Sequence, residues 1–139
     1  MTYGIGNPEG ILGIEKIFNV CRGFSWNDVR YVEKLDYYID LDEYGERVSN
    51  LKIHFIIELS NKSYYNLLVK FNEINNLCIN CIGGKYNQIM GFEIIDNSKL
   101  GWECEQRYSV RDYENTIVEF YCKSIEIVSL NICNEIFYE

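Results

Sequence analysis

Apolar and polar residues alternate along most of the chain after residue 28. Over residues 29–41 the odd-numbered positions are apolar except for Glu33, whereas most even-numbered positions carry a charge. A period of two is typical of a β-strand that buries one face, because successive side chains point to opposite sides of the backbone. The pattern therefore predicts a long half-buried strand over residues 29–41.

Two more alternating runs follow this strand. Residues 51–59 and 65–71 place an apolar residue at every second position, and the polar sequence Ser60-Asn61-Lys62-Ser63 separates them. Short polar turns between alternating runs are typical of antiparallel hairpins. We therefore predict a hairpin over 51–71, and a turn at Tyr44-Gly45-Glu46 between the first two strands.

Shorter runs complete the β pattern. They predict further strands over 77–82, 89–95 and 101–110, with one more in the tail over 132–138. In the segment from Val118 the alternation reaches Cys122 and resumes three positions later, at Ile125. Because a step of three instead of two needs one extra residue, this segment predicts a β-bulge at Lys123-Ser124.

The N-terminal part has a helical period. Pro8 and Glu9 suit a first helical turn, apolar residues recur at steps of three or four from Ile11 to Phe18, and Gly23 stands where a left-handed C-cap is expected. These features predict an amphipathic helix over about 8–22. The whole pattern predicts a mainly β single domain over residues 1–139, an antiparallel sandwich or partly open barrel of seven to eight strands with one short N-terminal helix.

Composition and charge narrow the function. The chain has 139 residues, with 13 Lys and Arg against 21 Asp and Glu, so its net charge is −8. A negative chain repels phosphate backbones, which argues against nucleic-acid binding. No apolar run approaches the roughly 18 residues of a membrane helix, and residues 1–9 show no secretory signal, so we expect a cytoplasmic protein without membrane contact.

Cysteines raise the question of a metal site or disulfides. There are six of them, at Cys21, Cys78, Cys81, Cys104, Cys122 and Cys133. Cys78 and Cys81 have the CxxC spacing of zinc ligands, but a zinc ribbon needs two such pairs, and residues three apart on a strand point to opposite faces. We expect reduced structural thiols and no metal, with a zinc site and disulfides as the alternatives.

Other candidate catalytic groups are few. His54 is the only histidine, so a Ser-His-Asp or Cys-His arrangement would have to use it, and it falls on the outward side of its strand. The spacing of the carboxylate pairs Asp40/Asp42 and Glu103/Glu105 could hold a metal or an acid–base pair, but a solvated strand face is the interpretation we favour. We predict no enzymatic activity and no cofactor.

Acidic residues gather around the first long strand and its turn. The candidate partner-binding residues are Asp36, Tyr38, Asp40, Asp42, Glu43, Tyr44 and Glu46. The tyrosines are included because their rings contribute a large contact area and a polar tip. A face of this charge attracts a basic partner over long range; the alternative is a solvated surface that keeps the protein soluble.

Two short motifs resemble a known family. One is Phe24-Ser25-Trp26-Asn27-Asp28-Val29, which leads into the first long strand, and the other is Val118-x-Phe120-x-Cys122-x-x-Ile125-x-Ile127. Their order resembles the small immunity proteins of bacterial polymorphic-toxin systems, in the family catalogued as number fifty, although Asn27 stands where that family has histidine. The resemblance implies a cytoplasmic, non-enzymatic protein that binds and neutralises a cognate toxin.

Three hypotheses of different classes follow from these features. The first is an immunity protein whose acidic surface binds a basic protein toxin. The second is a small-molecule carrier, because a β-barrel rich in tyrosine can enclose a ligand. The third is a structural domain that forms a homodimer.

Overall fold

The described part of the chain forms two antiparallel sheets. The computed structural model describes residues 10–85, 87–98 and 106–134. The first sheet has the strand order β1-β2-β3-β8, with the bounds Val29–Leu41, Arg47–Glu58, Tyr64–Asn72 and Ser124–Ile132. The second has the order β4-β7-β6-β5, with the bounds Asn75–Ile79, Val118–Cys122, Tyr108–Asp112 and Phe92–Asp96. The predicted mainly β antiparallel fold is confirmed, and the described strands do not close into a barrel.

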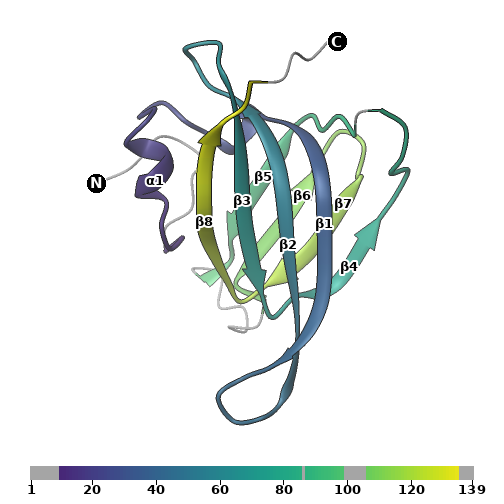
Figure 1. The fold of residues 1–139 in the computed structure, drawn as a ribbon. Helices are drawn as coiled ribbons and strands as arrows, with labels where there is room; N and C mark the ends of the chain where they lie inside the picture. Colours follow the sequence, from purple (N-terminus) through teal and green to yellow (C-terminus); the bar gives the residue numbers. More distant parts are fainter. Residues whose placement is uncertain (1–9, 86, 99–105, 135–139) are drawn as a thin grey trace.

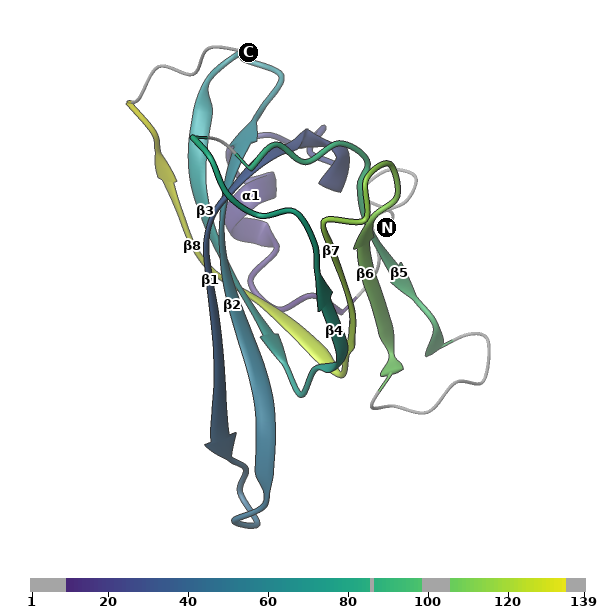
Figure 2. The same ribbon diagram turned by 90° about the vertical axis from the view of Figure 1, so that its right-hand side faces the viewer.

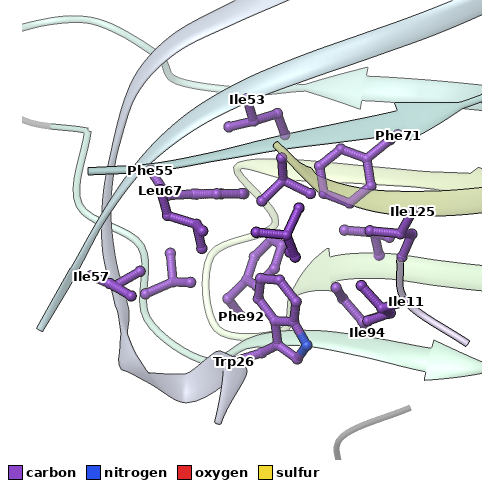
Figure 3. Packing of buried hydrophobic residues seen from close by; sticks show 14 of the residues in the cluster. Ile11, Trp26, Ile53, Phe55, Ile57, Leu67, Phe71, Phe92, Ile94 and Ile125 are labelled. Carbon is purple, nitrogen blue, oxygen red and sulfur yellow. The ribbon is translucent and has the colours of Figure 1, made fainter. Parts of the chain in front are cut away.

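The two sheets pack face to face across a shared hydrophobic core (Figures 1 and 2). Aromatic rings on facing strands meet edge to face, with 5.0 Å between the ring centroids of Phe71 and Phe120 and 5.1 Å between those of Phe55 and Phe92. Figure 3 shows side chains from both sheets, together with Trp26, converging on this layer. Such ring pairs add about 0.5–1.5 kcal/mol each beyond the burial of their surface.

The two sheets differ in length. Each strand of the second sheet has five residues, whereas β1 has 13. At about 3.3 Å per residue these strands span roughly 17 Å and 43 Å. The second sheet therefore covers only part of the first, and the end of the β1–β2 hairpin projects beyond it, at the bottom of Figures 1 and 2.

Both of the long β predictions are confirmed. β1 has the predicted bounds, and β2 pairs with β3 in antiparallel register from Leu51 opposite Phe71 to Glu58 opposite Tyr64. Within this paired stretch the core-facing side chains of β2, at Leu51, Ile53, Phe55 and Ile57, are fully buried, as the period of two requires. The alternation therefore located the central hairpin of the larger sheet.

Near the start of β1, Val29 lies in the core as predicted, but the face predicted for Tyr31 is wrong. The register with β2 shifts near Arg30 and again near Glu33. Each shift inserts one residue and turns the side chains that follow to the other side. Val32 consequently reaches the core, while Tyr31 packs with Ile56 on the opposite side of the sheet. The second shift also explains why Glu33 breaks the alternation in the sequence.

The N-terminal helix is much shorter than predicted. α1 (Glu15–Phe18) has only four residues, and the predicted start at Pro8 lies outside the described residues. Leu12 pairs with the edge of β8 instead: its N–H donates to the Ile125 carbonyl at 3.0 Å, and its carbonyl accepts the Ile127 N–H at 2.7 Å. Gly13 then turns the chain at a φ of 77°, where a Cβ would lie 2.7 Å from the Ile127 carbonyl oxygen.

Within the described ranges, no helix has both the length and the apolar character needed to cross a membrane.

The bulge predicted at Lys123-Ser124 is a change of sheet. β7 ends at Cys122 in the second sheet, and β8 begins at Ser124 in the first. Lys123 lies between them and donates its backbone N–H to the Asn72 carbonyl at 3.0 Å. Cys122 and Ile125 are both buried in the core, so the extra residue lets consecutive strands present side chains to one core from opposite layers.

The shorter strands begin and end where the backbone turns. β4 ends earlier than predicted, and Cys81 beyond it has a left-handed φ of 55°. β5 begins later than predicted, because Ile89 donates its N–H to the Arg30 carbonyl of β1 at 2.8 Å. β6 covers the end of the strand predicted over 101–110 and continues to Asp112, while residues 101–105 of that prediction lie outside the described residues, as does most of the strand predicted over 132–138.

Replacing Phe120 by alanine should lower the free energy of unfolding by about 3–5 kcal/mol, because the side chain is fully buried and joins the two sheets. Urea denaturation followed by circular dichroism measures the change. Tyr44→Ala is the control: its ring is 81% exposed, and the expected change is within about 0.5 kcal/mol. Equal losses in the two variants would contradict the packing described for the core.

Candidate functional site

The candidate site is the end of the β1–β2 hairpin that extends past the second sheet. Residues 36–49, termed the projecting hairpin, hold five acidic side chains and one basic one, which is −4 of the chain's net charge of −8. All seven residues predicted to bind a partner lie on it. The structure thus brings the predicted acidic face together on a single exposed element (Figure 2).

Asp42 shapes the turn at the end of this hairpin. Its Oδ1 accepts the backbone N–H groups of Tyr44 and Glu46, both at 2.9 Å. The Asp42 N–H donates to the Glu46 carbonyl, also at 2.9 Å, and Gly45 takes a φ of 77° that suits a residue without a Cβ. Asp42 is therefore a structural part of the turn, and it holds Glu43, Tyr44 and Glu46 at the exposed end.

Three of the predicted residues, Asp36, Tyr38 and Asp40, lie on the outer face of the hairpin, away from the core. The Lys34 Nζ is 3.4 Å from the Asp36 Oδ2, and the Lys52 Nζ lies 5.7 Å from the centroid of the Tyr38 ring. Lysines thus partly compensate this face near the body of the protein. Around the turn, Asp40, Asp42, Glu43 and Glu46 outnumber the single basic residue, Arg47.

The inner face of the projecting hairpin is apolar and exposed. Tyr37, Ile39 and Leu41 are on the same side of β1 as the core residues, yet they are 53%, 42% and 62% exposed. Their alternation predicted a buried face, which is wrong at these positions because the second sheet ends before it reaches them. Sequence reasoning missed these three as candidate binding residues. The sequence did contain a sign of this exposure. The alternating run over residues 29–41 is much longer than the later runs that form the second sheet, so those shorter strands could not cover all of it.

The other candidate catalytic groups form no cluster. His54 lies on the outer face of β2, opposite Leu68 of β3. The Asp40/Asp42 carboxylates bond to neighbouring backbone N–H groups, and Glu103/Glu105 lies outside the described residues. Across the part of the chain that the structure describes, no group of three or more His, Cys, Asp or Glu is placed to hold a metal ion.

The cysteines differ in exposure and in acidity. The described thiols are free, at Cys21, Cys78, Cys81, Cys122 and Cys133, and Cys104 lies outside the described residues. Burial raises the pKa of the Cys122 thiol well above its usual range. The Ser60 hydroxyl, 3.3 Å from the Cys21 Sγ, lowers the pKa of that thiol. Cys78 and Cys81 are both exposed around the end of β4.

The apolar residues of the two motifs that carry the family resemblance lie in the core. Phe24 and Trp26 meet edge to face with 5.2 Å between ring centroids, and Trp26 lies 5.8 Å from Phe92. The Asp28 Oδ2 accepts the Ser25 N–H at 3.1 Å, and burial raises the pKa of the Asp28 carboxyl. The five specified residues of the second motif are all buried. Core packing therefore accounts for the apolar residues of both motifs, and the Ser25–Asp28 bond holds the turn before β1, whereas Asn27 is exposed.

A small depression lies beside the start of β1. It encloses about 270 Å³ and is lined by Asn27, Arg30, Gln88, Ile89, Met90 and Gly91. Arg30 is engaged within it, because its Nη1 donates to the Asn27 carbonyl at 2.6 Å and its Nε lies 3.4 Å from the Glu58 Oε1. The site is polar and partly open, unlike the apolar enclosure typical of a small-molecule carrier.

Comparison with known proteins gives no assignment, since no family model, curated protein or solved structure matches the chain. The resemblance to the immunity-protein family stays a prediction.

Asp42→Ala should loosen the turn while Asp42→Asn should preserve it, because asparagine keeps the Oδ1 acceptor and loses only the charge. Losing the two bonds costs about 1 kcal/mol locally, which corresponds to roughly fivefold faster amide exchange. Residue-resolved hydrogen exchange at Tyr44 and Glu46 measures this change. Identical exchange in both variants would show that the Oδ1 bonds do not hold the turn.

Alkylation of the native protein by iodoacetamide at pH 8 should label Cys78 and Cys81 and leave Cys122 unmodified, because only a thiolate that solvent can reach reacts quickly. Peptide mass spectrometry measures the extent of labelling. The same reagent in urea is the control and should label Cys122 as well. Rapid native labelling of Cys122 would contradict its burial.

Proposed function

We propose that the protein is a non-enzymatic immunity protein that binds and neutralises a basic protein toxin through the projecting hairpin. The observation that carries the proposal is the hairpin itself, which combines a net charge of −4 with an exposed apolar face. Protein interfaces commonly join an apolar centre to a polar and charged rim. A solubilising surface needs the charges but gains nothing from exposing Tyr37, Ile39 and Leu41.

The shape of the hairpin supports neutralisation by occlusion. Two paired strands are narrow, with about 4.8 Å between their axes, so they can enter a cleft that a whole domain cannot. A toxin that acts on nucleic acid needs a basic cleft to bind its substrate. An acidic hairpin inserted there would block the substrate without any chemistry of its own.

Charge would also make the binding fast. Complementary potentials raise association from about 10⁵–10⁶ M⁻¹s⁻¹ to as much as 10⁸–10⁹ M⁻¹s⁻¹ at low salt. The turn end of the hairpin projects beyond the second sheet (Figures 1 and 2), so Asp42, Glu43 and Glu46 in that turn would meet an approaching basic surface first. An immunity protein benefits from this speed because it must bind the toxin in the cytoplasm before the toxin reaches its target.

A triple variant removes three negative charges from the hairpin through Asp40→Asn, Asp42→Asn and Glu43→Gln. We expect it to associate with the cognate toxin at least about tenfold more slowly at low salt, and its association rate should depend less on salt concentration. The amides keep the oxygen that accepts the Leu41 N–H at Asp40 and the Tyr44 and Glu46 N–H groups at Asp42. Stopped-flow association across a range of salt concentrations measures both effects.

The matched control neutralises three exposed acids elsewhere, Glu15, Glu114 and Glu119, as glutamines. It changes the net charge by the same amount and should change the association rate far less. Growth of cells that co-express the toxin adds a functional readout, since the control should protect them and the hairpin variant should protect less. Equal effects of the two triple variants would show that the projecting hairpin is not the docking surface.

A further inference from the structure

The projecting hairpin has an open backbone edge as well as two side-chain faces. β1 is the outermost strand of its sheet. Its first residues are covered by residues 87–89, since the Val32 N–H donates to the Asn87 carbonyl at 3.0 Å and the Ile89 N–H donates to the Arg30 carbonyl at 2.8 Å. Beyond Val32, no backbone hydrogen bond from another described segment reaches this edge.

The open stretch is regular. From Lys34 to Leu41 the pairing with β2 continues without a register shift. At the opposite edge of the sheet, by contrast, Leu12 bonds to β8 and a register shift interrupts that strand. Uncovered regular edges attract other strands, and proteins usually protect them with bulges, short strands or charges.

Along β1 and β2, hydrogen-bonded residue pairs alternate with non-bonded pairs, and this alternation shows which backbone groups of β1 face the open edge. Asp42 bonds to Glu46 across the turn, and bonded and non-bonded pairs alternate along an antiparallel ladder. The N–H and C=O groups of Leu35, Tyr37 and Ile39 therefore point away from β2. Leu41 follows the same rule, and its N–H is already bonded to the Asp40 Oδ1 at 2.8 Å, which marks the outer end of the open stretch.

We propose that the partner docks by strand addition, with an extended segment of its chain pairing along β1 from Lys34 to Leu41. The inference deepens the proposed function and rests on it for the identity of the partner. The segment would alternate apolar and basic residues. Its apolar side chains would lie beside Tyr37, Ile39 and Leu41 on the inner face, and its basic ones beside Asp36 and Asp40 on the outer face.

Charge complementarity favours a basic segment over a second copy of this chain. Two projecting hairpins, each with a net charge of −4, repel each other as they approach. The same charge attracts a basic strand. The acidic side chains thus protect the edge from self-association while leaving it available to one kind of partner.

The direct probe is a capped eight-residue peptide of alternating lysine and valine. Added to the full chain, it should slow the amide exchange of Leu35, Tyr37 and Ile39 at least about tenfold, while Asp36 and Tyr38, already bonded to β2, change little. A control peptide with two adjacent N-methylated residues at its centre cannot pair through either edge and should have no effect. Unchanged exchange at millimolar peptide, or equal effects of both peptides, would overturn strand addition.

Two variants test whether the toxin itself binds through the backbone edge of β1. Ile39→Pro removes the N–H that faces the open edge without removing a bond to β2, whereas Ile39→Ala removes most of the side chain and keeps the N–H. The proline variant should bind the toxin at least ten times more weakly than the alanine variant. If the proline and alanine variants bind the toxin equally well while the acidic triple variant still associates slowly, strand addition is overturned. The hairpin would then still be the toxin-binding site, but its backbone edge would not take part.

The two proposals fail in distinguishable ways. A toxin that does not bind, together with a peptide that protects the three edge amides, would overturn the immunity role and support the strand-pairing edge. Light scattering measures the oligomeric state of the protein and of its Ile39→Pro variant. If the protein is a dimer and the variant a monomer, the edge pairs with a second copy of this chain, and the proposal of a basic partner is overturned.

Discussion

The packing of two sheets of unequal length is the constraint on which the rest of the structure depends. Phe71 against Phe120 and Phe55 against Phe92 fix the layers face to face, and this contact buries the apolar side of every strand that the shorter sheet can reach. The five-residue strands of the second sheet end well before β1 does. What extends past that contact becomes the exposed hairpin.

Different parts of that hairpin carry different chemistry. The outer face is acidic, the inner face is apolar, and the free edge offers backbone donors and acceptors. A partner that contacted both faces and the free edge would associate faster because of the charge and bind more tightly because of the apolar contacts. Its backbone hydrogen bonds would fix the register of the two strands. Asp42 has two roles in the hairpin, because its carboxylate accepts the hydrogen bonds that close the turn and also contributes to the negative charge.

The candidate site was partly predictable. The acidic residues were visible because charge is a property of each residue and because β1, with its turn, could be located from alternation. The apolar half was not, because Tyr37 follows the same pattern as Leu51, and the two differ only in what lies opposite them: Leu51 is fully buried, and Tyr37 is 53% exposed. Periodicity identifies a face of a strand but not whether another layer covers it.

By itself, the sequence determined the antiparallel β class, the bounds of β1, the central hairpin and the net charge, because each follows from local alternation, turn residues or composition. The tertiary structure alone decided that Leu12 joins the edge of β8 instead of a long helix, that Lys123 marks a change of sheet, and that the end of β1 stays uncovered. These outcomes depend on which segments distant in the chain meet, and local periodicity contains no information about such contacts. Helical spacing near Ile11 and a strand-edge pairing compete for the same residues, and the available edge of β8 decided between them.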